Sequence, residues 1–135
     1  MNQNEDLWAK RSIGLKLWSF KSDPYQIAKA LKLQSIPIAK GDAHGKKNTY
    51  KENQIHILHL MPEDSCWGDS FVELVAELGG VDGVLELIKA IEPANYFFVM
   101  NIPTSDTWSG SGNNLSKEVI AMLQRLDTDI AFNFF

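Results

Sequence analysis

The sequence predicts one α+β domain, a two-layer sandwich in which a mixed or mainly antiparallel sheet of about five strands carries helices packed on one face. Three observations favour this class. The 135-residue chain has the size of one domain. Segments with period-two hydrophobicity alternate with segments at helical spacing. Hydrophobic residues make up 44% of the chain, enough for a packed core. We expect a flexible N-terminus over residues 1–12 and a single domain over residues 13–135.

The first two elements are predicted to be a strand and a capped helix. Apolar residues recur at every second position early in the chain, which predicts a strand over residues 13–20. Asp23 suits the N-cap of a helix, and Pro24 suits the first helical position. Because apolar residues at helical spacing follow, we expect this helix to cover residues 24–32.

A short extended segment, a polar loop and a second strand follow. Residues 33–38 are predicted to be extended, and Pro37 limits them to a sheet edge or an irregular strand, since proline lacks an N–H. Residues 39–53 are polar and predict a loop. Strand-forming residues over 54–60 predict a mostly buried strand, which Pro62 ends.

Two consecutive helices are predicted next. Ser70 and Glu73 have the spacing of a capping box, so we expect the first helix to begin at Ser70. The pair Gly79-Gly80 ends it, because a left-handed C-terminal position favours glycine. Asp82 is expected to cap the second helix, which Pro93 closes. The residues expected to face inward on this pair are Leu74, Val75, Leu78, Val84, Leu85, Ile88 and Ile91.

The remaining elements are a strand, a long loop, a helix and a C-terminal strand. Residues 95–102 are apolar on both faces, so we expect an interior strand. Residues 103–114 predict a long loop. Ser116 suits the N-cap of a helix over residues 117–126, and alternation from Ile130 onward predicts the last strand. The residues expected to face inward on this helix are Val119, Ile120, Leu123 and Leu126.

Charge is distributed unevenly along the chain. Residues 1–53 carry ten Lys/Arg against five Asp/Glu, and residues 54–135 carry three against twelve. We expect the two halves to interleave in space and give a mixed surface; the alternative is a charged face for a polar partner. The basic residues are not grouped with aromatic ones, so no nucleic-acid partner is expected.

The compartment is predicted from cysteine content and hydropathy. The single cysteine, Cys66, permits no intramolecular disulfide, which fits a reducing compartment. The polar, acidic start does not have the pattern of a secretory signal. No apolar run reaches the roughly 18 residues of a membrane helix. We therefore expect a cytoplasmic protein without a membrane partner.

The order of several short motifs resembles a bacterial family of unknown function. The residues that carry the resemblance are Leu15-Lys16-Leu17, Asp23-Pro24, Lys40-Gly41-Asp42, Val72 to Leu78, Leu115-Ser116 and Leu126-Asp127-Thr128-Asp129-Ile130. In this order they are similar to the domain-of-unknown-function family number forty-two seventy-nine, over residues 13–135. Because that family lacks an assigned activity, the resemblance implies a fold rather than a function.

No catalytic site, metal site or cofactor is predicted. The glycines around Asp42 and His44 have the wrong spacing for a phosphate loop, and a solvated turn or a basic lip for an anion explains them. His56 and His59 differ by three positions, so they should point to opposite faces of their strand. Acidic neighbours disfavour the thiolate of Cys66. A hydrolase or transferase would need Asp42, His44 and His56 to converge in one cleft.

Tryptophans in loops give the candidate binding residues. Trp67 and Trp108 are predicted to lie in loops, Trp108 together with Asp106, and Trp18 in the first strand. Exposed tryptophans are enriched where proteins contact partners, and the alternative is that each covers the core.

A non-enzymatic binding domain is therefore our hypothesis. Its expected partner is another protein, for example the toxin masked by an immunity-type protein. The alternative is a small-molecule-binding or sensing domain with its ligand against the face of the sheet, near Trp18 and Trp108. A flat acidic face would favour the protein partner, and a deep apolar pocket would favour the small molecule.

Overall fold

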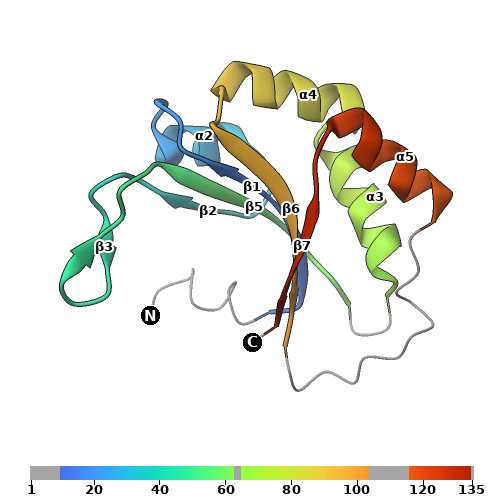
Figure 1. The fold of residues 1–135 in the computed structure, drawn as a ribbon, viewed down its shortest axis with the longest axis horizontal. Helices are drawn as coiled ribbons and strands as arrows, with labels where there is room; N and C mark the ends of the chain where they lie inside the picture. Colours follow the sequence, from blue (N-terminus) through green and yellow to red (C-terminus); the bar gives the residue numbers. More distant parts are fainter. Residues whose placement is uncertain (1–9, 63–64, 104–115, 135) are drawn as a thin grey trace.

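The computed structural model describes residues 10–62, 65–103 and 116–134 and shows helices packed over one β-sheet (Figure 1). Along the chain the elements are β1 (Ser12–Trp18), α2 (Pro24–Ala30), β2 (Ser35–Ile38), β3 (Ala43–His44), β4 (Asn48–Thr49), β5 (Gln54–Leu60), α3 (Trp67–Glu77), α4 (Gly80–Ile91), β6 (Asn95–Ile102), α5 (Lys117–Leu126) and β7 (Ile130–Phe134). Helices α3, α4 and α5 lie on one side of the sheet, and none of the described helices lies on the opposite side (Figure 1). The predicted α+β class is confirmed.

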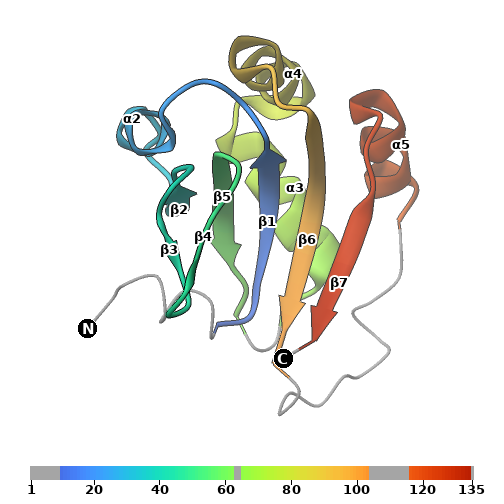
Figure 2. The ribbon, with the colours of Figure 1, turned by 60° about the vertical axis from the view of Figure 1, so that its left-hand side comes forward.

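The main sheet of the described residues has five strands in the order β2-β5-β1-β6-β7. Strand β1 is central and pairs antiparallel with both β5 and β6. Strand β2 adds antiparallel to β5, and β7 adds parallel to β6. Figure 2 shows β7 at one edge of the sheet. The sheet is therefore mixed, and Pro37 lies in the opposite edge strand, where its missing N–H costs no hydrogen bond within the sheet.

The hydrophobic core lies between the sheet and α3, α4 and α5. Ile13, Leu15 and Leu17 alternate along β1 and are completely buried on this side. Across the layers, the ring of Phe71 on α3 meets the ring of Phe98 on β6 edge-on, with 4.8 Å between centroids. Each such side chain stabilises the fold by about 1.5–3 kcal/mol relative to exposure. The period-two pattern that predicts β1 therefore also decides which face of the sheet is covered.

Gly14 allows β5 to approach β1 closely on the opposite face. A Cβ at Gly14 would lie 2.8 Å from the backbone oxygen of Ile57 and 2.9 Å from Cδ2 of Leu58. Both distances are shorter than side chains tolerate, so a larger residue would push β5 away. Leu58 instead packs with Ile36, Ile38 and Tyr50 in a second, smaller apolar cluster.

The predicted helix starts are right for two helices. Asp23 accepts a hydrogen bond from the backbone N–H of Tyr25, 3.0 Å away, at the start of α2. Ser116 likewise accepts a hydrogen bond from the backbone N–H of Val119 at 3.2 Å. In both cases the side-chain oxygen satisfies an N–H that has no partner within the helix.

The predicted caps of the other two helices are wrong. Helix α3 begins at Trp67, and Ser70 lies inside it at 2% exposure. Burial of Trp67 in the core extends this helix beyond the local capping signal. Helix α4 begins at Gly80, directly after Gly79, whose φ of 97° turns the chain between the two helices. Asp82 lies in the first turn, where its carboxylate interacts favourably with the helix dipole.

Two residues expected to face inward are exposed. Leu85 on α4 is 38% exposed and Ile120 on α5 is 41% exposed. Each follows a valine, Val84 or Val119, that is almost completely buried. Neighbouring helical residues point about 100° apart, so only one of each pair can face the sheet directly. The apolar pattern therefore identifies the inward-facing side of each helix, but not which of two adjacent apolar residues faces the sheet.

The two halves of the chain, basic and acidic, meet in the sheet and also in the helical layer, where α2 from the basic half lies beside α3 and α4. Strand β1, from the basic half, lies between β5 and β6, as predicted. Helices α3, α4 and α5 all come from the acidic half, and the hairpin of β3 and β4 comes from the basic half. Figure 1 shows this hairpin far from those helices. Among the described residues, none of the helices is long and apolar enough to cross a membrane.

Candidate functional site

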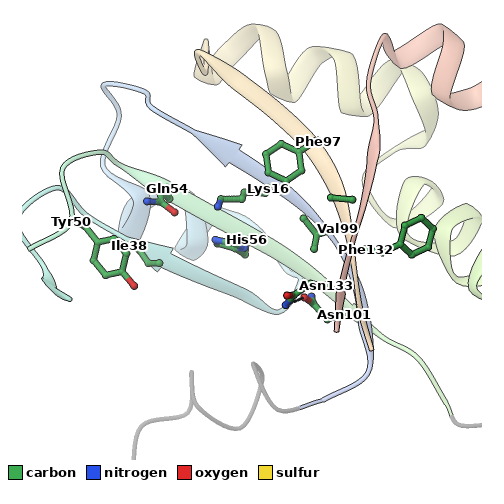
Figure 3. A pocket seen from close by; sticks show the side chains of 11 residues that line it. Lys16, Ile38, Tyr50, Gln54, His56, Phe97, Val99, Asn101, Phe132 and Asn133 are labelled. Carbon is green, nitrogen blue, oxygen red and sulfur yellow. Dashed lines mark hydrogen bonds between the residues drawn. The ribbon is translucent and has the colours of Figure 1, made fainter. Parts of the chain in front are cut away.

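The face of the sheet opposite the helices carries a hollow of about 450 Å³ (Figure 3). Ligand pockets commonly enclose about 300–1,000 Å³, so a small molecule would fit. Strands β1, β5, β6 and β7 each contribute side chains to it. The side chains that line it include Lys16, Gln54, His56, Phe97, Asn101 and Asn133, with Tyr50 from the segment before β5. The hollow is open to solvent and mixes aromatic, amide and basic groups.

Lys16 lies at the centre of a row of three side chains across three strands. The register places it opposite His56 on β5 and opposite Phe97 on β6. Its Nζ atom lies 5.7 Å from the centroid of the Phe97 ring, within the range of a cation–π interaction. Partial burial lowers the pKa of Lys16. Among the described residues that line the hollow there is no Asp or Glu.

His56 is neutral at physiological pH. The residue is 9% exposed, and burial is the largest cause that lowers its pKa, to about 3. The positive charge of Lys16 lowers it further in the same direction. A charged imidazole next to the ammonium would be costly to bury. Lys16 is therefore the only charged side chain among the described residues that line the hollow at neutral pH.

A chain of amide hydrogen bonds fixes one end of the hollow. Asn101 on β6 is buried, and its Nδ2 donates to the Oγ atom of Ser12 on β1 at 3.1 Å. Its Oδ1 accepts a hydrogen bond from Nδ2 of Asn133 on β7 at 3.0 Å. This chain connects β1, β6 and β7, so the side chain of Asn133 is held in place beside the hollow (Figure 3).

The tryptophans predicted to bind a partner have different environments. Trp18 is 37% exposed at the end of β1, on the same face as Lys16, but it does not line the hollow. Trp108 and Asp106 lie outside the described residues. The prediction that Trp67 lies in a loop is wrong: this residue begins α3 and is 1% exposed.

Trp67 is part of the core. Its ring meets the ring of Phe132 on β7 edge-on, with centroids 6.2 Å apart. Its buried Nε1–H has no hydrogen-bond acceptor among the described residues. Its burial supports the alternative interpretation, in which this tryptophan covers the core.

The residues considered for a hydrolase have separate environments. Asp42 accepts hydrogen bonds from the hydroxyl of Tyr25 at 2.6 Å and from the backbone N–H of Ala39 at 2.9 Å. The ring of His44 packs against Tyr50, with 4.3 Å between centroids. His56 lies in β5, opposite Lys16 of β1 and Ile36 of β2.

The two histidines of β5 point to opposite faces, as predicted. His56 lines the hollow, whereas His59 faces α3, where its ring nitrogens lie 2.9 Å from a carboxylate oxygen of Glu73 and 3.2 Å from one of Glu77. Across the described part of the chain, no three His, Cys, Asp or Glu side chains are grouped closely enough to hold a metal ion.

The hollow was not predicted from the sequence as a site. In the sequence, His56 is a candidate metal ligand or hydrolase residue, and Lys16 is one position of an alternating strand and of the motif Leu15-Lys16-Leu17. The available signal is the lysine between Gly14 and Trp18 on one face of a strand whose other face is entirely apolar. A charged residue on a central strand is unusual unless that face is solvated or binds a ligand.

Comparisons of the chain with protein-family models, with curated proteins and with solved structures found no match. The resemblance to the domain-of-unknown-function family therefore stays a prediction.

Proposed function

We propose that the protein is a non-enzymatic binding domain of the cytoplasm and that it binds a small molecule in the hollow on the open face of the sheet. The observation that carries this proposal is the row of His56, Lys16 and Phe97 across three strands, on a face that none of the described helices covers. A rigid sheet holds these side chains in fixed positions, which lowers the entropy lost on binding.

The chemistry of the lining favours a small molecule over a protein partner at this surface. A protein partner is expected to meet a flat acidic face, but the hollow is concave, and none of the described residues that line it is acidic. The hollow is also neither deep nor wholly apolar. Recognition must therefore come from its few polar groups, with Phe97 and Tyr50 supplying apolar contact.

Chemical-shift mapping by NMR tests this proposal. We expect that a library of aromatic fragments contains members that cause saturable shifts of backbone amides around Gly14, Lys16 and His56. The variant Ala131→Trp places a large side chain at the rim of the hollow and should abolish these shifts.

A matched variant separates occlusion of the hollow from a general effect of a new tryptophan. Ala121→Trp adds the same side chain at an exposed position of α5 and should leave binding unchanged. If no fragment shifts residues of the hollow, or if both variants behave alike, the proposal is wrong.

A protein partner is the second candidate, and a different surface favours it. Strand β7 is an edge of the sheet, and Phe132 and Phe134 on it are 49% and 59% exposed. Edge strands can accept an additional strand from another chain. We propose that a partner, such as the toxin of an immunity-type pair, would add an extended segment to β7.

Affinity capture with matched variants tests the edge-strand candidate. A protein captured from host lysate by the wild type should be lost with Phe134→Lys and retained with Leu85→Lys, which changes an exposed leucine on α4. Capture that survives Phe134→Lys would contradict a role for β7.

A further inference from the structure

We propose that the small molecule bound in the hollow is an organic anion, and that its carboxylate or phosphate group pairs with Lys16. This inference rests on the proposed binding function and names the chemical class of the ligand. Its basis is the partly buried charge of Lys16, which no described neighbour neutralises.

The charge balance of the hollow leaves Lys16 without a counter-ion. Among the described residues, Lys16 forms no ion pair, and its ammonium lies over the uncharged ring of Phe97. The two residues opposite it in the sheet, His56 and Phe97, carry no negative charge. A partly buried ammonium has lost part of its hydration, so an anion would gain more there than at an exposed lysine.

The charge of Lys16 favours an anion over a cation, and neighbouring amides can add hydrogen bonds to it. Gln54 and Asn133 line the hollow with side-chain amides, which donate hydrogen bonds to carboxylate or phosphate oxygens. The low pKa of His56 keeps a second charge out of the site, so a single anionic group would balance the hollow.

The remaining lining defines the other part of the ligand. Ile38, Tyr50 and Val99 offer apolar surface in the same hollow. A volume of about 450 Å³ matches a molecule of one or two rings. The ligand class is therefore a flat, largely apolar body with one acidic group.

A matched set of probes tests this assignment. We would titrate the protein with 2-naphthoate, 2-naphthyl phosphate and the uncharged 2-naphthamide, and measure dissociation constants by NMR. The acids are expected to bind about tenfold more tightly than the amide, a difference of about 1.4 kcal/mol. The carboxylate and phosphate arms show which acidic group is preferred.

Two lysine variants assign the preference to one side chain. In Lys16→Gln the dissociation constants of the acids and of 2-naphthamide should become about equal, because the glutamine side chain carries no charge. Lys46→Gln removes an exposed lysine of the β3–β4 hairpin and should leave the preference for the acids unchanged. A second readout is the pKa of His56, which should rise in Lys16→Gln and when an acid binds, since the charge of Lys16 helps to lower it.

The outcomes separate this inference from the proposed function. If acids and amide bind equally in the hollow, or if the preference for acids survives Lys16→Gln, the assignment of an organic anion paired with Lys16 is wrong. The proposed binding function would still hold. Probe-induced shifts that lie elsewhere on the protein would overturn both.

Discussion

Replacing Trp67 with alanine is expected to lower the free energy of unfolding by about 3–5 kcal/mol, the usual cost of removing a large buried aromatic side chain. The side chain is 1% exposed, begins α3 and packs against Phe132 of β7. Its removal would leave a cavity between the helical layer and the edge of the sheet. Urea unfolding followed by circular dichroism measures the loss.

Trp18→Ala is the matched control for this prediction. Trp18 is 37% exposed at the end of β1, so its removal should cost much less stability than that of Trp67. A Trp67→Ala protein as stable as the wild type would contradict the place of Trp67 in the core. It would restore the hypothesis of a tryptophan that contacts a partner.

Acidification from pH 7 to pH 5 is expected to destabilise the protein through His56 by about 2 kcal/mol. The folded state lowers the pKa of His56 from its ordinary value of 6.5 to about 3. Between these values the unfolded chain binds a proton that the folded protein does not. The stability is therefore complete above about pH 6.5 and decreases as the pH falls towards 3.

Two substitutions isolate the contribution of His56. His56→Gln keeps a polar side chain that does not titrate, so its stability should lose about 2 kcal/mol less than the wild type over the same pH interval. His44→Gln changes a histidine on the exposed β3–β4 hairpin and should keep the wild-type pH profile. Denaturant unfolding at each pH provides the comparison, and identical profiles for wild type and His56→Gln would exclude this role of His56.

The candidate site was less predictable than the fold, because it depends on strand register. Lys16 and His56 are far apart in the sequence, and Phe97 is farther still, yet pairing of β1 with β5 and β6 places them in one row. No local pattern states which strands pair or at which residue. The tryptophans were candidates because their residue type is common in binding surfaces. Trp67 is almost completely buried, so it is not an exposed contact.

Local patterns determined most of the elements. The predicted strands over residues 54–60 and 95–102 coincide with β5 and β6, and the predicted helix over 117–126 coincides with α5. Each depends on a hydrophobic period or a cap that a few neighbouring residues supply. Such signals are independent of the rest of the chain, which is why the sequence was sufficient for them and for the α+β class.

Only the tertiary structure decided where α3 begins, which face of the sheet stays open and which side chains meet there. Ser70 has an adequate capping pattern, but burying Trp67 contributes several times the free energy of a cap, roughly 1 kcal/mol, and moves the start of the helix. The open face exists because α3, α4 and α5 pack on the same side of the sheet. These outcomes depend on contacts between distant residues, and no segment of the sequence contains them by itself.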